Sequence, residues 1–152
     1  MTEKPLTGGC QCGAVRFRAA SLGRPSICHC RMCQKATGSF FGPYATAHGV
    51  VWTRGETKRF QSSNVAARGF CGECGTPLTY EYGGGLELTI GSFDDPTVAA
   101  PAIQTNPTDK LAFFDTLHEL PVLPASKTAE LNRLVVSNQH PDHDTDAWPP
   151  AN

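Results

Sequence analysis

Seven cysteines carry the chemistry that this sequence could perform, and they fall into three clusters. Thiolates one to four residues apart can share one zinc ion, which binds sulfur at about 2.3 Å in a tetrahedral arrangement. A glycine ends the first and third clusters, at Gly13 and Gly75, where it frees the backbone to turn around a metal. The clusters therefore predict zinc sites. The first cluster is Cys10 and Cys12, the second is Cys28, Cys30 and Cys33, and the third is Cys71 and Cys74.

A disulfide framework is the main alternative interpretation of so many cysteines. Such frameworks are typical of secreted chains with an even number of cysteines. This chain has seven, and its first residues, MTEKPLTGG, lack the apolar segment of a signal peptide. No apolar run approaches the roughly 18 residues that cross a membrane. We therefore expect a cytoplasmic protein with no membrane partner, whose reduced thiols bind metal.

Seven thiolates divide most simply into four and three. One division joins the first and third clusters and leaves the second cluster as a set of its own. The rival division joins the first cluster to two members of the second, and leaves Cys33 with the third cluster. We favour the first division, because the spacing C-x-C-x-x-C lets three thiolates face one metal from a single loop. It defines a four-cysteine set (Cys10, Cys12, Cys71 and Cys74) and a three-cysteine set (Cys28, Cys30 and Cys33).

The two sets differ in the number of ligands that they offer. A structural zinc site is closed by four protein ligands, whereas a catalytic site keeps three and leaves one position for water or substrate. The four-cysteine set is therefore the structural candidate, and the three-cysteine set is both a metal site and the catalytic candidate. Two alternatives stay open for the three-cysteine set. His29, His48 or His118 closes it as a fourth ligand, or its thiols form a redox-active cluster without metal.

Short strands separated by turn residues must position these clusters. The 15 glycines and 12 prolines exclude long helices over most of the chain. Residues 14–18 alternate apolar and polar side chains, as a half-buried strand does. Two hairpins are predicted, over residues 50–60 around a turn at 54–56, and over residues 78–90 around a glycine loop at 83–85.

Two helices and a tail complete the predicted organisation. A short helix is predicted over residues 31–37, ended by the glycine that follows. A second is predicted over 126–137, with Ser126 as its N-cap. Residues 138–152 are polar and rich in proline, so we expect them to be disordered. The rest, residues 1–125, is long enough for one mainly β domain with its own core.

The charges are unevenly distributed although the net charge is only −1. Residues 1–75 carry ten Lys and Arg against three Asp and Glu, while the remainder carries three against eleven. Either the cations stabilise an anionic thiolate site and attract an anionic substrate, or the two halves neutralise each other in the fold. The basic residues are scattered rather than clustered, which argues against a nucleic-acid surface.

The order of four motifs resembles the glutathione-dependent formaldehyde-activating (Gfa) family, to whose superfamily centromere protein V also belongs. They are GGCQCGAVRF at 8–17, CHCRMCQKATG at 28–38, RGFCGECGTPL at 68–78 and IGSFDDP at 90–96. The resemblance covers about residues 6–125. It implies a single-domain, zinc-stabilised, mainly β fold of the centromere-protein-V/Gfa type with short helices.

The resemblance also implies two zinc ions per chain, a structural one in the four-cysteine set and a catalytic one in the three-cysteine set. The family reaction condenses glutathione with formaldehyde to S-(hydroxymethyl)glutathione, which is a carbon–sulfur lyase reaction in reverse. The expected partners are therefore a small thiol such as glutathione and a small aldehyde. Arg31, Lys35 and the backbone N–H groups of the short helix are candidate donors to the alkoxide that develops.

A function without catalysis is the rival interpretation. Three thiolates make zinc electron-rich, which favours holding a thiol over polarising a carbonyl. The addition of thiols to formaldehyde also proceeds without an enzyme. A non-catalytic zinc-binding module, or a carrier of glutathione, would use the same residues.

Overall fold

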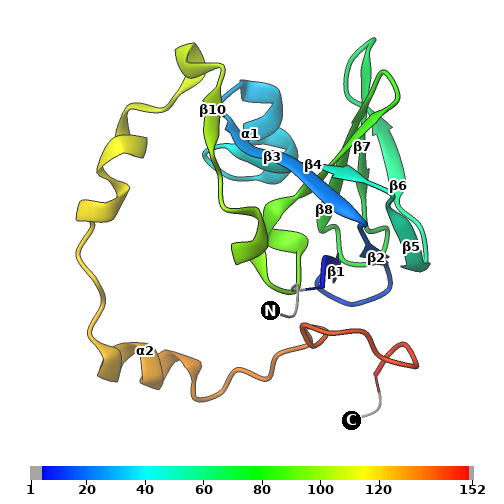
Figure 1. Ribbon diagram of the computed structural model, residues 1–152. Helices are drawn as coiled ribbons and strands as arrows, with labels where there is room; N and C mark the ends of the chain where they lie inside the picture. Colours follow the sequence, from blue (N-terminus) through cyan, green and yellow to red (C-terminus); the bar gives the residue numbers. More distant parts are fainter. Residues whose placement is uncertain (1–4, 151–152) are drawn as a thin grey trace.

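The computed structural model describes residues 5–150, which fold mainly as short strands in two sheets (Figure 1). The mainly β class predicted from the sequence is confirmed. The smaller sheet has the order β1-β2-β5, with strands Thr7–Gly9, Arg16–Arg18 and Val51–Arg54. The larger sheet has the order β10-β3-β4-β9-β8-β7-β6, in which only the pair β10 and β3 is parallel. Its strands are β3 (Ser21–Cys28), β4 (Gly42–His48), β6 (Lys58–Gln61), β7 (Ala66–Phe70), β8 (Pro77–Tyr82), β9 (Gly85–Thr89) and β10 (Ile103–Thr105).

The hydrophobic core gathers buried side chains from both sheets. Phe17 of β2 is fully buried and meets Trp52 and Phe93 edge to face, with ring centroids 6.2 and 5.3 Å away. Such contacts add to the free energy that burial of the rings provides. Cys10 and Cys71 belong to the same buried cluster. The core thus extends to Cys10 and Cys71 and fixes the two loops that carry them.

One predicted hairpin is confirmed and the other is wrong. Strands β8 and β9 pair antiparallel, as expected for residues 78–90. Strands β5 and β6 do not pair, because β5 joins β2 in the smaller sheet and β6 joins β7 in the larger one. Trp52 of β5 packs against the core, whereas Phe60 of β6 is 64% exposed. The turn at Gly55, with φ of 60°, therefore connects two sheets instead of closing a hairpin.

The short helix α1 spans Arg31–Thr37, as predicted, and ends at Gly38 in a left-handed conformation. The second helix, α2, spans Ala125–Asn132, so it starts at Pro124 as N-cap and stops short of the expected residue 137. The longest helices in residues 5–150 have eight residues, too short to cross a bilayer. The 3₁₀ helices are Ile90–Ser92, Pro96–Ala99, Pro107–Asp109 and Ala112–Glu119.

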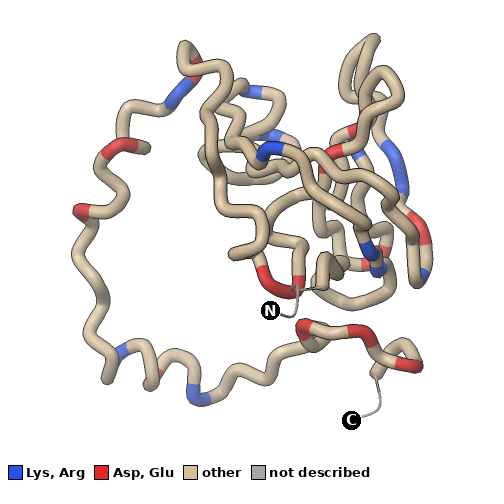
Figure 2. The backbone as a smooth tube through the Cα atoms, viewed as in Figure 1, with Lys and Arg blue, Asp and Glu red and all other residues tan. Residues whose placement is uncertain are grey.

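The end of the chain leaves the domain and returns to it (Figure 1). Residues 120–138, here called the arm, are exposed throughout. Residues 139–150, the tail, lie against the domain and carry several acidic positions (Figure 2). This differs from the disorder expected from composition. Composition gave no sign of the contacts, because the tail meets a folded turn that lies more than 120 residues earlier.

Candidate metal centres

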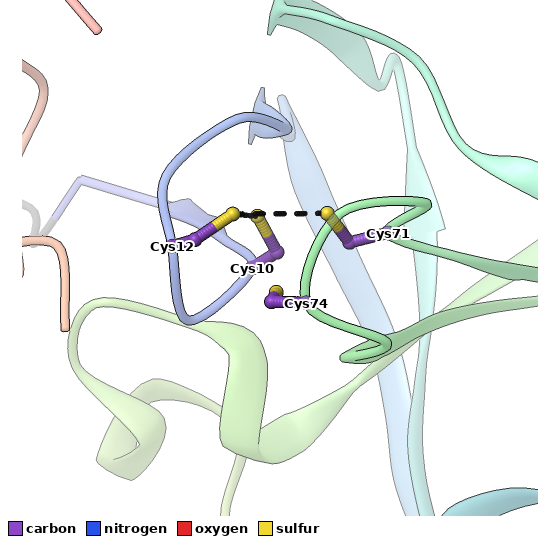
Figure 3. Close-up of side chains that lie close together, drawn as sticks. All are labelled: Cys10, Cys12, Cys71 and Cys74. Carbon is purple, nitrogen blue, oxygen red and sulfur yellow. Dashed lines mark hydrogen bonds between the residues drawn. The ribbon is translucent and has the colours of Figure 1, made fainter. Parts of the chain in front are cut away.

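Four cysteines from two loops meet at the edge of the core (Figure 3). Cys10 and Cys12 lie in the turn after β1, and Cys71 and Cys74 lie in the loop between β7 and β8. Their sulfur atoms are within 4.8 Å of one another, with 3.6 Å between Cys10 and Cys12 and 3.9 Å between Cys12 and Cys71. Sulfurs at the corners of a tetrahedron around zinc would be about 3.8 Å apart, whereas a disulfide needs about 2.05 Å. The spacing therefore fits zinc.

The two glycines singled out in the sequence make these loops possible. Gly13 and Gly75 have φ angles of 80° and 78°, which side chains with a Cβ rarely adopt. Each donates its N–H back to the first cysteine of its loop, Gly13 to the Cys10 carbonyl at 3.0 Å and Gly75 to the Cys71 carbonyl at 2.9 Å. The turns hold the two sulfurs of each loop on one side.

The protonation of three of these thiols bears on how a cation could be held. Burial raises the pKa of Cys12 to about 12, and neighbouring thiols add to this shift. Burial also raises the pKa of Cys10, where Cys71 adds to the shift and hydrogen bonds with Val15 and Cys12 oppose it. Burial would raise the pKa of Cys74 as well, but hydrogen bonds involving Thr76 and Cys12 outweigh it and lower that pKa to about 6. Burial therefore disfavours the thiolate forms of Cys10 and Cys12. A divalent cation among the four sulfurs would offset that effect.

The other three cysteines come from one stretch of chain. Cys28 ends β3, Cys30 is the N-cap of α1, and Cys33 lies in the first turn of that helix. Their sulfur atoms are within 4.8 Å of one another. The structure thus gathers the seven cysteines as four and three, in the first of the two divisions weighed from the sequence.

Each sulfur of the three-cysteine set accepts at least one hydrogen bond, and the three donors named here differ. The Asn106 Nδ2 donates to Cys28 at 3.1 Å, the Cys33 backbone N–H to Cys30 at 3.4 Å, and the Arg68 Nη2 to Cys33 at 3.4 Å. Hydrogen bonds to thiolates favour the charged form. Each sulfur that would ligate a metal therefore has a hydrogen-bond donor beside it.

Cys28 and Cys33 do not ionise equally. Burial raises the pKa of Cys28, but hydrogen bonds from the Thr105 hydroxyl, the Cys30 backbone and Asn106 outweigh it, so the net shift is downward. Burial dominates at Cys33 and raises its pKa to about 12, although Arg68 opposes the shift. Of these two thiols, Cys28 therefore forms the thiolate more readily, and a metal ion would be needed to deprotonate Cys33 at neutral pH.

No histidine within residues 5–150 joins either set of sulfurs. His29 is fully buried, with its Nε2 2.8 Å from the Gln104 Oε1 and its ring edge-on to Phe114 at 4.8 Å. It supports the segment that carries Asn106 against the loop of the three-cysteine set. The fourth ligand expected under one alternative is therefore not supplied by His29, and His48 and His118 are not near the sulfurs either.

Sequence reasoning missed two donors to sulfur. Arg68 is 7% exposed, and its guanidinium lies 4.8 Å above the Tyr80 ring while its Nη1 donates to the Tyr44 hydroxyl at 2.7 Å. Asn106 has φ of 53°, a conformation for which asparagine is enriched among residues other than glycine. Arg68 stands three residues before Cys71 in a quoted motif, so attention to non-cysteine positions there could have found it.

A cavity of about 650 Å³ opens beside the three sulfurs. Tyr44, Tyr80 and Tyr82 contribute aromatic walls. Among the residues that line it, Arg68 is the single cation and Glu87 the single carboxylate. Burial raises the pKa of Glu87, although a hydrogen bond with Thr46 and the charge of Arg68 act against the shift.

A second cavity, of about 570 Å³, adjoins the first and shares Met32 and Arg68 with it. Arg31 and Lys35, which the sequence offered as donors to a reacting oxygen, line this second cavity and not the one beside the sulfurs. Asn106 and Arg68, in contrast, contact the sulfurs directly.

Ion pairs connect the basic first half of the chain to the acidic second half. Arg16 is 3% exposed and binds both Asp94 and Asp144 at 2.7 Å, and Arg59 binds Glu81. These pairs favour mutual neutralisation of the halves over a large basic surface. Arg31 and Lys35 form no ion pair with any acidic residue of the described range.

Comparison with known proteins identifies a family whose model covers these cysteines. The family model described as glutathione-dependent formaldehyde-activating enzyme matches residues 5–107, which include all seven cysteines. The chain is 33% identical over 81 residues to an uncharacterized lyase of Schizosaccharomyces pombe, a match that covers 51% of this chain and 58% of that protein. A crystal structure of a Rhodobacter sphaeroides protein superposes with a TM-score of 0.53 at 21% identity, over 66% of this chain and 100% of that one. The last similarity concerns the fold alone.

Proposed function

Because the chain belongs to the glutathione-dependent formaldehyde-activating enzyme family, we propose that it is a zinc-dependent carbon–sulfur lyase acting on thiol–aldehyde adducts. The substrate would be S-(hydroxymethyl)glutathione or a similar adduct, formed or cleaved according to concentration. The lyase named in fission yeast is consistent with this class of reaction.

The observation that carries the proposal is the three-cysteine set itself. Its three sulfurs come from residues 28–33, face a cavity of about 650 Å³, and have no fourth protein ligand among the described residues. Three protein ligands are the arrangement that catalytic zinc sites use. A zinc ion held by Cys28, Cys30 and Cys33 would keep a substrate thiol deprotonated at neutral pH.

The reaction needs charge to move between sulfur and oxygen. When the adduct forms, the thiol loses its proton and a carbon–sulfur bond forms, while the π bond of the aldehyde carbonyl breaks and its electron pair moves to the oxygen, which gains a proton. Asn106 and Arg68 donate to Cys28 and Cys33, and each has further N–H groups beyond those used for sulfur. Both donors line the cavity beside the sulfurs, so we assign them the stabilisation of the negative charge that develops on the oxygen.

The same hydrogen bonds bear on the electron-rich character of a three-thiolate zinc site. A donor to a thiolate withdraws part of the charge that the sulfur gives to the metal. Three such donors therefore leave the ion a better acceptor for the substrate than three bare thiolates would. The four-cysteine set, with Cys10 and Cys71 inside the core cluster, would hold a second zinc ion with a structural role.

Exchange NMR of glutathione with formaldehyde tests the proposal, since the uncatalysed rate gives the baseline. The zinc-loaded protein should accelerate interconversion of adduct and free aldehyde, and replacement of Cys28, Cys30 and Cys33 by serine should return the rate to the baseline. Acceleration that survives this replacement would contradict the role of the three-cysteine set. No acceleration, together with a spectral response of the cobalt-substituted protein to glutathione, would indicate the carrier.

A further inference from the structure

The two cavities beside the three-cysteine set differ in the charge of their lining residues, and this difference favours one binding orientation for a ligand that carries both charges. We infer that a γ-glutamyl thiol such as glutathione binds with its α-ammonium toward Glu87 and its glycine carboxylate toward Arg31 and Lys35. The inference rests on the proposed function and specifies how the same site recognises its thiol.

The acidic end belongs to the larger sheet. The strand register pairs Arg68 with Tyr80, Tyr80 with Glu87, and Glu87 with Thr46. These four side chains form a row across β7, β8, β9 and β4, and directly opposed residues share one face of a sheet. The row places Glu87 on the wall of the cavity that holds the sulfurs.

Glu87 is suited to an ammonium group. It is the one carboxylate lining that cavity, and no side chain within residues 5–150 forms a salt bridge with it. Tyr80 and Tyr82 lie beside each other, with ring centroids 5.3 Å apart. Aromatic faces next to a carboxylate favour a cation. The carboxylate that accompanies the ammonium in a γ-glutamyl group can remain at the open mouth of the cavity.

Arg68 is held beside the sulfurs, so it is a poor partner for a carboxylate at the far end of a ligand. It is 7% exposed, and each of its three nitrogens already donates one hydrogen bond, the Nε to the Ser62 Oγ at 2.9 Å and the others to Tyr44 and Cys33. Its guanidinium also covers the Tyr80 ring. A terminal carboxylate in the first cavity would therefore meet thiolates and Glu87, and the one cation there keeps its remaining N–H groups close to Cys33.

The basic end lies on α1, next to the sulfurs. Arg31 and Lys35 are four residues apart, so they project from the same face of the helix. Arg31 donates to the Gln34 side chain at 2.7 Å, and neither cation has an acidic partner in the described range. Met32 separates this end from the sulfurs while lining both cavities. A ligand with its thiol at the sulfurs can pass Met32 to reach them.

The test uses the full chain loaded with cobalt, whose thiolate spectrum reports a thiol entering the open position. Glutathione, its glycine ethyl ester and its analogue lacking the α-amino group are titrated separately. For the unsubstituted protein, each analogue should bind about tenfold more weakly than glutathione, the loss of one charged contact. Glu87→Gln should abolish the penalty for the missing amine and keep that for the ester. Arg31→Gln with Lys35→Gln should do the reverse.

Glu81→Gln is the matched control, since Glu81 lies on the neighbouring strand, pairs with Arg59 and does not line the cavity. It should leave both penalties unchanged. Equal binding of all three ligands, or an exchange of the two mutant effects, overturns the orientation while the proposed function stands. A cobalt spectrum that does not respond to glutathione at all overturns both.

Discussion

Asn106 holds the sulfur of Cys28 from a separate segment of the chain, with its Nδ2 3.1 Å from the Sγ and its backbone in a left-handed conformation. The preceding strand, β10, runs parallel to β3, and the Thr105 carbonyl accepts the His29 N–H at 3.0 Å. The loop of the three-cysteine set is thus fixed by residues more than 70 positions later. Its geometry depends on tertiary contacts as well as on the spacing of its cysteines.

Two replacements of Asn106 should distinguish the effect of its hydrogen bond to Cys28 from the effect of its left-handed backbone conformation. Asn106→Gly keeps the left-handed conformation and removes the donor, so metal affinity at the three-cysteine set should fall about 10- to 100-fold with stability nearly unchanged. Asn106→Ala removes the donor and also adds about 1 kcal/mol of backbone strain. Competition with a chelator measures the affinity, and thermal unfolding measures the stability. Equal metal affinity of Asn106→Gly and the unsubstituted protein would refute the role of this donor.

The two cysteine sets should respond differently when their cysteines are replaced by serine. The triple replacement of Cys28, Cys30 and Cys33 should leave a folded chain that binds one zinc ion, because the core does not depend on these residues. Replacement of Cys10 and Cys12 should instead cost the fold, because a structural zinc contributes directly to folding. Metal content by elemental analysis and circular dichroism distinguish the outcomes. A triple variant that unfolds would assign a structural role to both sets.

The spacing of the cysteines favoured the division that the structure has, and Gly38 marked the end of the helix α1. Local sequence determines the shape of each cysteine loop, since each closes on itself through a glycine or a cap, whereas the meeting of residues 10–12 with residues 71–74 depends on tertiary contacts. The hairpin wrongly predicted over residues 50–60 shows what local sequence does not determine, namely which strands pair. A turn signal at Gly55 says that the chain bends, but the choice of partner strand was made by the contact of Trp52 with Phe17, far away in sequence.

Arg68 and Asn106 were missed for a related reason. Arg68 stands in a quoted motif that does not mark it as a donor to sulfur, and Asn106 lies outside the quoted motifs. The role of both residues appears only when β7 and the end of β10 come beside the sulfurs. Glu87 is similar, since it becomes a cavity residue through the register of β8 and β9. The two cysteine sets were therefore predictable from spacing, and the residues that surround them depended on strand pairing.

Acid should destabilise the fold through Asp94. Burial raises the pKa of this carboxyl, but Arg16 and Thr7 outweigh it, so the net shift is downward. The ionised group therefore stabilises the fold above the unfolded pKa of about 3.9, and that contribution is lost as pH falls through the folded pKa. Asp94→Asn should cost about 3–5 kcal/mol at pH 7, because it leaves the buried Arg16 charge poorly compensated.

Asp144 provides the comparison, since it binds the same arginine but its side chain is 51% exposed. Asp144→Asn should cost less than about 1 kcal/mol at pH 7. Denaturant unfolding at pH 7 and near pH 3 measures both. The loss in free energy of unfolding caused by Asp94→Asn should be smaller near pH 3 than at pH 7. A loss independent of pH would mean that the carboxylate charge is not its cause.

The tail should protect the four-cysteine set. Trp148 donates its Nε1 to the Cys12 carbonyl at 2.6 Å, the His140 N–H donates to the Gln11 carbonyl at 2.7 Å, and Arg54 donates to Thr145. The first two contacts are made to the turn that carries Cys10 and Cys12, and Arg54 links the third to the same turn by donating to the Gly13 carbonyl at 3.1 Å. Since a ligand loop must open before its metal can leave, removal of residues 139–152 should speed zinc loss from this set by about tenfold or more.

The measurement is sharpest in the triple serine variant of the three-cysteine set, where the remaining zinc belongs to the four-cysteine set alone. Transfer of zinc to a coloured chelator gives the rate. Trp148→Phe serves as the milder comparison, because it keeps an aromatic ring and removes only the donor to Cys12, so its rate should lie between those of the intact and the shortened chains. An unchanged rate after removal of the tail would show that the turn at residues 10–13 holds the metal by itself, and that the tail lies on it without strengthening it.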